Sequence, residues 1–155
     1  MNKRAIALLS GGLDSILAAR LMLEQGIEVI AVNFSAKLCM CGHKKTGESA
    51  AQIAAKMLGI PLKTIDITDD FMEIVKNPQH GHGANMNPCI DCKIYMFKHA
   101  KVMMDKSGAS FRVTGEVLGE RPMSQRMDAL NIIEKAAGVK GIRLRPLTAK
   151  NLDPT

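Results

Sequence analysis

The stretch that decides the fold is residues 5–25, which read AIALLSGGLDSILAARLMLEQ. Its first five residues form a short apolar run, which is typical of a buried strand in a parallel sheet. A polar turn with two glycines follows, and from Leu13 apolar residues recur at helical spacing until Gly26 ends the pattern. A strand that passes through a glycine turn into a helix is the repeating unit of α/β folds.

The same alternation continues along the chain. Strands are predicted at residues 5–9, 27–34, 62–67, 110–114 and 142–147, and helices at 13–25, 48–58, 71–76, 91–106 and 123–137. Asp69 or Asp70 is expected to cap the third helix, and Pro122 to stand at the start of the last. These patterns predict one α/β domain over residues 1–155, with a five-stranded parallel sheet and helices on both faces. The chain stops just past the last strand, so it is expected to end in a loop or to be the N-terminal part of a longer protein.

Composition and charge narrow the classes of partner. The formal net charge is +6, which is compatible with an anionic partner such as ATP or RNA, and ordinary solubility charge is the alternative. Aromatic residues make up only 3% of the chain, which argues against base stacking on exposed aromatic platforms. No apolar run approaches the roughly 18 residues of a membrane span, and no signal-peptide pattern is present. We therefore expect no membrane partner, and a cytoplasmic protein whose cysteines stay reduced.

The turn after the first strand, called the glycine loop below, has the features of a phosphate-binding site. Its glycines let the backbone approach a ligand closely, and its amides and the helix N-terminus attract anions. Two serine hydroxyls add donors, whereas Asp14 would repel phosphate unless a cation such as Mg²⁺ lay between them. The alternative is a plain tight turn. The loop consists of Ser10, Gly11, Gly12, Leu13, Asp14 and Ser15.

This hexapeptide resembles the Ser-Gly-Gly-x-Asp-Ser signature of the PP-loop ATP pyrophosphatase superfamily. The resemblance implies a Rossmann-like fold of the adenine nucleotide alpha hydrolase type. It also implies that ATP is cut between its α and β phosphates, with Mg²⁺, while the loop holds the leaving pyrophosphate. By position, Asn33 at the end of the second strand would lie at the adenosine. Gly115 and Arg121, after the fourth strand, would close over the nucleotide.

Two cysteines open the fourth predicted helix. Cys92 is expected in its first turn, where the helix dipole and the lysines that follow favour the thiolate. Such a cysteine is a candidate nucleophile or metal ligand, and an inert buried thiol is the alternative. Cys39 and Cys41 could join Cys89 and Cys92 as four thiolates around a [4Fe–4S] cluster or Zn²⁺. Independent thiols remain the other interpretation.

Residues 83–98, which contain Asn-Pro-Cys-x-x-Cys-Lys, resemble the tRNA 2-thiouridylases of the PP-loop group. The resemblance implies that Cys92 takes part in sulfur transfer. That family has a second catalytic cysteine far downstream, and this chain has none after Cys92. The partner thiol would then be Cys89, Cys39 or Cys41, or the sulfur would come from an external donor protein or sulfide.

The two resemblances together imply ATP-dependent adenylation of a substrate oxygen with release of pyrophosphate, followed by sulfur transfer to a tRNA uridine. In this scheme Asp14, Cys89 and Cys92 are the catalytic candidates. Two alternatives stay open. One is an ammonia-using, amide-forming PP-loop enzyme whose cysteines are structural, and the other is a non-catalytic module that binds ATP or a metal.

Overall fold

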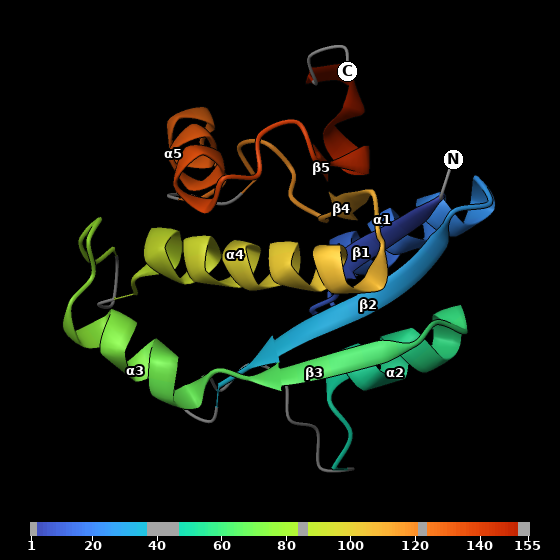
Figure 1. The fold of residues 1–155 in the computed structure, drawn as a ribbon, viewed down its shortest axis with the longest axis horizontal. Helices are drawn as coiled ribbons and strands as arrows, with labels where there is room; N and C mark the ends of the chain where they lie inside the picture. Colours follow the sequence, from blue (N-terminus) through green and yellow to red (C-terminus); the bar gives the residue numbers. More distant parts are fainter. Residues whose placement is uncertain (1–2, 37–46, 84–86, 121–123, 152–155) are drawn as a thin grey trace.

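The computed structural model describes residues 3–36, 47–83, 87–120 and 124–151 (Figure 1). No helix in these ranges combines the length and the apolar character that crossing a bilayer requires. The elements run in the order β1 (Arg4–Leu8), α1 (Leu13–Glu24), β2 (Glu28–Ser35), α2 (Ala50–Leu58), β3 (Leu62–Asp66), α3 (Thr68–Lys76), α4 (Cys89–Ser107), β4 (Phe111–Val113), α5 (Met127–Ala137), β5 (Arg143–Leu144) and the 3₁₀ helix η2 (Pro146–Asn151).

The sheet has five parallel strands in the order β3-β2-β1-β4-β5, which confirms the predicted fold class. β1 lies at the centre, where Ile6 is in register with Ile30 of β2 and with Arg112 of β4. The chain builds outward from β1 to β3, then returns to add β4 and β5 on the other side of β1. In such sheets ligands bind beyond the carboxyl ends of the strands, where the strand order reverses. The end of β1 is therefore the expected place for a site.

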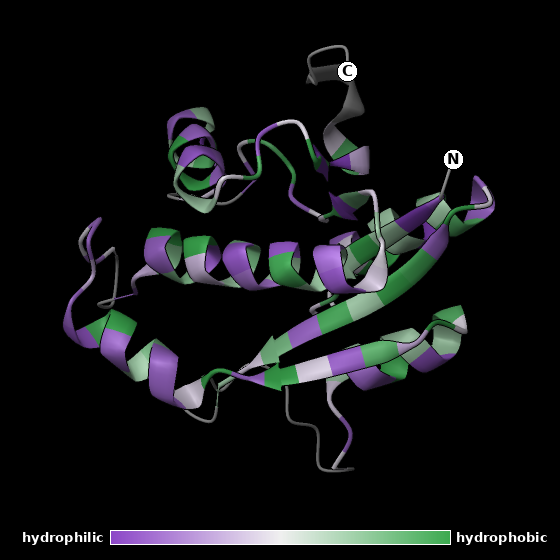
Figure 2. Ribbon diagram, viewed as in Figure 1, coloured by the Kyte–Doolittle hydropathy of each residue, from purple (hydrophilic) through white to green (hydrophobic). Residues whose placement is uncertain are grey.

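Helices cover both faces of this sheet. Figure 1 shows α4 crossing one face, with α1 and α2 behind the other. Side chains of β1 alternate between the two layers: Ala5 and Ala7 pack with α1, whereas Ile6 packs with Ala100 and Met104 of α4. Figure 2 shows β2 apolar along most of its length, whereas the middle of β3, an edge strand, is polar.

Several predicted boundaries are wrong. α4 begins at Cys89, two residues earlier than predicted, so both cysteines belong to its first turn. α5 begins at Met127 rather than residue 123, because residues 124–126 form a turn in which Gly119 donates from its amide to the Gln125 carbonyl at 3.0 Å. Pro122 lies outside the described residues. The last strand is only two residues long, because Pro146 has no amide hydrogen to continue the ladder.

The expected cap of α3 is also wrong. The helix begins at Thr68, so Asp69 and Asp70 lie inside its first turn. The N-cap residue is Ile67, which has no side-chain cap, and the Asp66 carboxylate just before it accepts from the Thr68 amide at 2.9 Å. A short carboxylate two residues ahead of an amide forms this local bond readily, which explains why the helix starts earlier than predicted.

Candidate functional site

The glycine loop, residues 10–15, joins β1 to α1 and is held by its own serines. The Ser15 hydroxyl donates to the Gly12 carbonyl at 2.8 Å, and the Gly12 amide donates to the Ser10 hydroxyl at 3.3 Å. The two hydroxyls lie 3.2 Å apart. No side chain caps α1 at Gly12. The helix therefore begins with backbone amides free for a ligand, as an anion site needs.

Glycines at two positions let other segments pack against this loop. Gly11 has a φ of +85°, and a Cβ there would lie 2.4 Å from the backbone carbon of Ala50 at the start of α2. A Cβ on Gly115 would lie 2.5 Å from the backbone of Asp14 and Ser15. Only glycine permits either approach. The loop is thus enclosed by α2 on one side and by the segment after β4 on the other.

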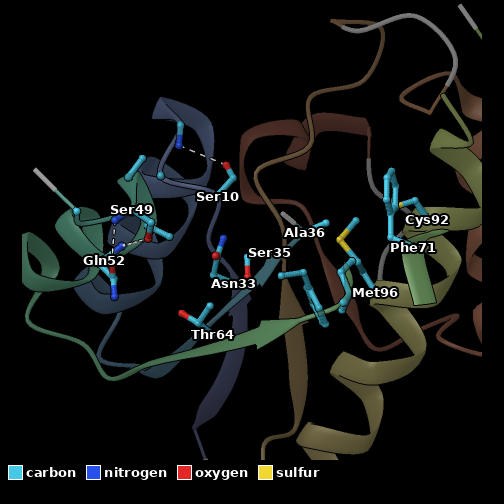
Figure 3. Close-up of a pocket in the computed structure, with 17 residues that line it drawn as sticks. Ser10, Asn33, Ser35, Ala36, Ser49, Gln52, Thr64, Phe71, Cys92 and Met96 are labelled. Carbon is cyan, nitrogen blue, oxygen red and sulfur yellow. Dashed lines mark hydrogen bonds between the residues drawn. The ribbon is translucent and has the colours of Figure 1, made fainter. Parts of the chain in front are cut away.

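A cavity of about 770 Å³ extends from the glycine loop to α4 (Figure 3). This volume is within the range of small-molecule sites. One end is polar and is formed by Ser10, Gly11, Gly12, Ser49 and Gln52, with Asn33, Ser35 and Thr64 in the middle. The other end is mostly apolar and contains Ala36, Phe71, Met96 and Cys92. The glycine loop and Cys92, far apart in sequence, therefore share one space.

Asn33 lines the middle of the cavity, as its place at the end of β2 predicted. Its side-chain amide nitrogen donates to the carbonyl of Leu9 at 2.9 Å. This bond ties the end of β2 to the residue that leads into the glycine loop. Asn33 therefore has a structural role at the rim of the site, and contact with a nucleotide stays a prediction.

Asp14 lies in the first turn of α1 and is half-buried, but it does not line the cavity. Among the described residues none forms a hydrogen bond or ion pair with its carboxylate. Mg²⁺ prefers carboxylate oxygens as ligands, so the unpaired Asp14 carboxylate next to the glycine loop is chemically suited to hold this metal. The side chain of the neighbouring Leu13 is exposed (70%), so Leu13 contributes only its backbone to the glycine loop.

Cys92 does not have the thiolate character expected from its helix position. Its amide donates to the Pro88 carbonyl at 2.9 Å, which places it in the first turn of α4. Burial, and then the nearby Cys89, raise the pKa of the Cys92 thiol to about 11, although Lys93 acts in the opposite direction. Desolvation of the charged form thus outweighs the attraction of the nearby Lys93 charge. The prediction of a lowered pKa is wrong, and the resting group is a neutral thiol.

Half of the predicted four-cysteine site lies outside the described residues. Cys39 and Cys41 lie outside them, as does Arg121. Cys89 and Cys92 are both free thiols, and only Cys92 lines the cavity. Within the described ranges no three histidine, cysteine or carboxylate side chains gather as metal ligands would. A cluster or zinc ion held by four thiolates stays a prediction.

A buried ionic cluster beside the site escaped the sequence analysis. Glu116, only 7% exposed, accepts from Lys93 at 2.5 Å and from Arg143 at 3.3 Å, and the Thr114 hydroxyl donates to it at 3.1 Å. Burial alone would raise the pKa of the Glu116 carboxyl, but Lys93 and Arg143 hold it below its ordinary value. Residues 115 and 116 therefore connect the glycine loop to the residue after Cys92.

The cluster continues under α4 and α5. Arg143 also pairs with Glu134, which lies 3.5 Å from Arg145. Fully buried Arg112 stacks on the Phe97 ring at 3.8 Å, and its Nε and Nη2 find no partner among the described residues. An arginine inside an otherwise apolar short strand is the one signal in the sequence that could have indicated such a cluster.

Comparison with protein families matches residues 1–153 to the family described as thiamine biosynthesis protein (ThiI). The "tRNA-specific 2-thiouridylase MnmA" of Clostridium acetobutylicum is 33% identical over 128 residues, covering 74% of this chain and 36% of that protein. The "Probable tRNA sulfurtransferase" of Thermococcus kodakarensis is 32% identical over 143 residues, covering 86% of this chain and 34% of that protein. The chain thus spans about a third of the length of these curated relatives.

Solved structures share the fold. A 4-thiouridine synthetase in complex with RNA and bound ATP superposes with a TM-score of 0.71 at 24% identity, covering 94% of this chain and 37% of that one. The U34-tRNA thiolase NcsA from Methanococcus maripaludis, with its [4Fe-4S] cluster, gives a TM-score of 0.55 at 18% identity, covering 90% of this chain and 58% of that one.

Proposed function

The chain belongs to the ThiI family, and from that premise we propose that it is an ATP-using sulfurtransferase domain that thiolates a uridine in tRNA. Family membership confirms the resemblance to the PP-loop superfamily in residues 10–15 and to its thiolation proteins in residues 83–98. The observation that carries the proposal is the shared cavity: the glycine loop lines one end and Cys92 the other. Activation by ATP and delivery of sulfur could then occur on one bound substrate.

In the first step a carbonyl oxygen of the uridine attacks the α-phosphorus of ATP. The bond between the α-phosphorus and the bridging oxygen breaks, and pyrophosphate leaves with the electron pair. The amides and hydroxyls of residues 10–15 hold its negative charge, which lowers the barrier because they are already oriented. Asp14 would hold Mg²⁺, which neutralises phosphate charge when bound.

In the second step the terminal sulfur of a persulfide on Cys92 attacks the activated carbon of the base. The carbon–oxygen bond breaks and AMP leaves. Cleavage of the remaining sulfur–sulfur bond needs a second thiol, which Cys89, in the same helical turn, is positioned to supply. The resulting disulfide must be reduced by an external thiol. The persulfide forms when the Cys92 thiol, once deprotonated, attacks the outer sulfur of a persulfide on an external donor protein, whose own thiolate leaves. Free sulfide would instead attack the activated carbon directly and displace AMP without Cys92.

The cysteines also suit a metal centre. Cys89 and Cys92 would supply two thiolates to a [4Fe–4S] cluster or Zn²⁺, which would carry or hold sulfur when bound. The support is the thiolase NcsA, a fold neighbour that contains such a cluster. Purification without oxygen tests this point: iron and labile sulfide support the cluster, and zinc without iron indicates a structural site.

We place this activity in the cytoplasm, with tRNA as the partner. The net charge of +6 supports binding to the phosphate backbone, because each lysine or arginine that meets a phosphate releases a counterion. The names of the relatives support tRNA as the substrate class.

The test measures pyrophosphate release and thiolated nucleosides with ATP, Mg²⁺, unmodified tRNA and a donor protein that carries a persulfide. We expect Asp14→Asn to abolish pyrophosphate release and Cys92→Ala to abolish only thiolation. Asp128→Asn is the matched control, because Asp128 also lies in the first turn of a helix but is exposed and remote from the cavity. Ammonia-dependent pyrophosphate release that survives Cys92→Ala would indicate amide formation. ATP binding without pyrophosphate release would indicate a non-catalytic module.

A further inference from the structure

Glu116 connects the two ends of the cavity, although it does not line the cavity itself. It follows Gly115, whose Cα lies so close to the backbone of Asp14 in the glycine loop that a Cβ would have no room. Its carboxylate accepts from Lys93, the residue after Cys92, at 2.5 Å. The glycine loop and Cys92 line opposite ends of the cavity (Figure 3), so this one residue bridges the elements that carry both.

The position of Glu116 is fixed by contacts from three further places. The Thr114 hydroxyl donates to its carboxylate at 3.1 Å, and Arg143 of β5 donates to the same oxygen at 3.3 Å. The backbone carbonyl of Glu116 accepts from the Thr148 hydroxyl of η2 at 2.9 Å. A buried carboxylate with this many partners has a single well-defined place, because any shift would leave a buried polar group unpaired.

The ion pair between Lys93 and Glu116 carries this fixed position over to Cys92. The side chain of Lys93 is 20% exposed and that of Glu116 is 8% exposed, so separating the two charges would leave the carboxylate poorly compensated in a site with little water. Lys93 directly follows Cys92 in the continuous helix α4, so holding Lys93 also holds the thiol. The glycine loop, Gly115, Glu116 and this end of α4 therefore form one connected unit.

We propose that Glu116 is a positioning residue that, through Lys93, sets the place of Cys92 relative to the glycine loop, so that sulfur reaches the activated base before water does. The inference rests on the proposed function, because it concerns the passage from the first step to the second. Water that attacks the activated carbon displaces AMP and restores the original carbonyl, so ATP is consumed without thiolation. Misplacing the thiol by about 1 Å slows sulfur transfer up to about a hundred-fold and leaves this hydrolysis unchanged.

The test measures the thiolated uridine formed per pyrophosphate released, with ATP, Mg²⁺, unmodified tRNA and a donor protein that carries a persulfide. Lys93→Met and Glu116→Gln weaken the link from its two sides, and each should lower this ratio roughly ten- to a hundred-fold relative to wild type. Lys93→Arg keeps a cation that can pair with Glu116 and should restore the ratio. The double variant should have no lower ratio than the worse single variant, because both changes act on the same pair.

The ratio separates positioning from stability, because a loss of folded protein lowers both products together. Lys101→Met is the matched control: Lys101 also ties α4 to another segment, by donating to the Gly138 carbonyl at 2.9 Å, but it does not line the cavity, and its ratio should equal that of wild type.

A lowered ratio in Lys93→Met with a wild-type ratio in Glu116→Gln would mean that Lys93 acts only through its charge on the thiol, and would overturn the proposal. A wild-type ratio in both variants would overturn it as well. Wild-type protein that releases no pyrophosphate, or releases it without thiolating uridine, would contradict the proposed function itself and this inference with it.

Discussion

Replacing Gly115 by alanine tests whether the segment after β4 forms a wall of the nucleotide site. The added Cβ would lie 2.5 Å from the backbone of Asp14 and Ser15, whereas ordinary contacts begin at 3.4 Å. The new Cβ would thus be 0.9 Å too close to backbone atoms of Asp14 and Ser15, which cannot rotate away as a side chain can. The glycine loop must therefore move by about 1 Å, at a cost of about 1–3 kcal/mol in an already packed region.

A displacement of this size should affect binding more than folding. We expect the dissociation constant for ATP, measured by calorimetry, to rise about ten- to a hundred-fold, because the loop amides no longer converge on the phosphates. The control is Gly141→Ala, where a Cβ meets no atom within 4 Å and the cost comes only from a φ of +81°. That variant should lose stability but keep its ATP affinity. Wild-type affinity in Gly115→Ala would refute the reasoning.

The ionic cluster and the cysteine give three further predictions. Glu116→Gln should cost about 3 kcal/mol of stability at neutral pH, because it removes the buried carboxylate that Lys93 and Arg143 share. The folded protein lowers the pKa of Glu116, so the Glu116 carboxylate contributes its full stabilisation above the ordinary pKa of 4.5. This stabilisation is lost as the pH falls through the lowered pKa. The difference in melting temperature between Glu116→Gln and wild type should therefore shrink in acid. The rate of Cys92 alkylation, measured by mass spectrometry of samples quenched at successive times, should rise with pH up to about 11. Lys93→Met should shift this pH–rate profile to higher pH, because Lys93 lowers the pKa of the Cys92 thiol. Urea unfolding should find Arg112→Met within about 1 kcal/mol of wild type and Arg143→Met several kcal/mol less stable. The reason is that Arg143 forms ion pairs with Glu116 and Glu134, whereas Arg112 forms none with the described residues; equal losses would contradict this account.

The architecture was predictable because it depends on local patterns. The apolar run of β1, the glycine turn and the helical spacing of α1 are contiguous in sequence, and each remaining strand has a similar signature. The same patterns explain why Cys92 and the glycine loop line one cavity, because the loops and helix starts that follow parallel strands lie at the same edge of the sheet.

What the sequence could not predict depends on burial and on distant partners. The pKa of Cys92 is set by desolvation, which only the folded chain determines. Lys93, Glu116 and Arg143 are separated by more than twenty residues from one another, so no local pattern connects them. The place of Phe71 beside Cys92 likewise depends on how α3 packs against α4.

The strand order has a consequence for synthesis of the chain on the ribosome. β1 and the glycine loop emerge first, but β4 and Gly115, which complete one side of the loop, follow about a hundred residues later. At an elongation rate of about 5–20 residues per second that delay is roughly 5–20 s. During this interval one edge of β1 has no neighbouring strand. The glycine loop therefore gains its second wall only after β4 and Gly115 have been synthesised, and until then the exposed edge of β1 is open to pairing with other chains.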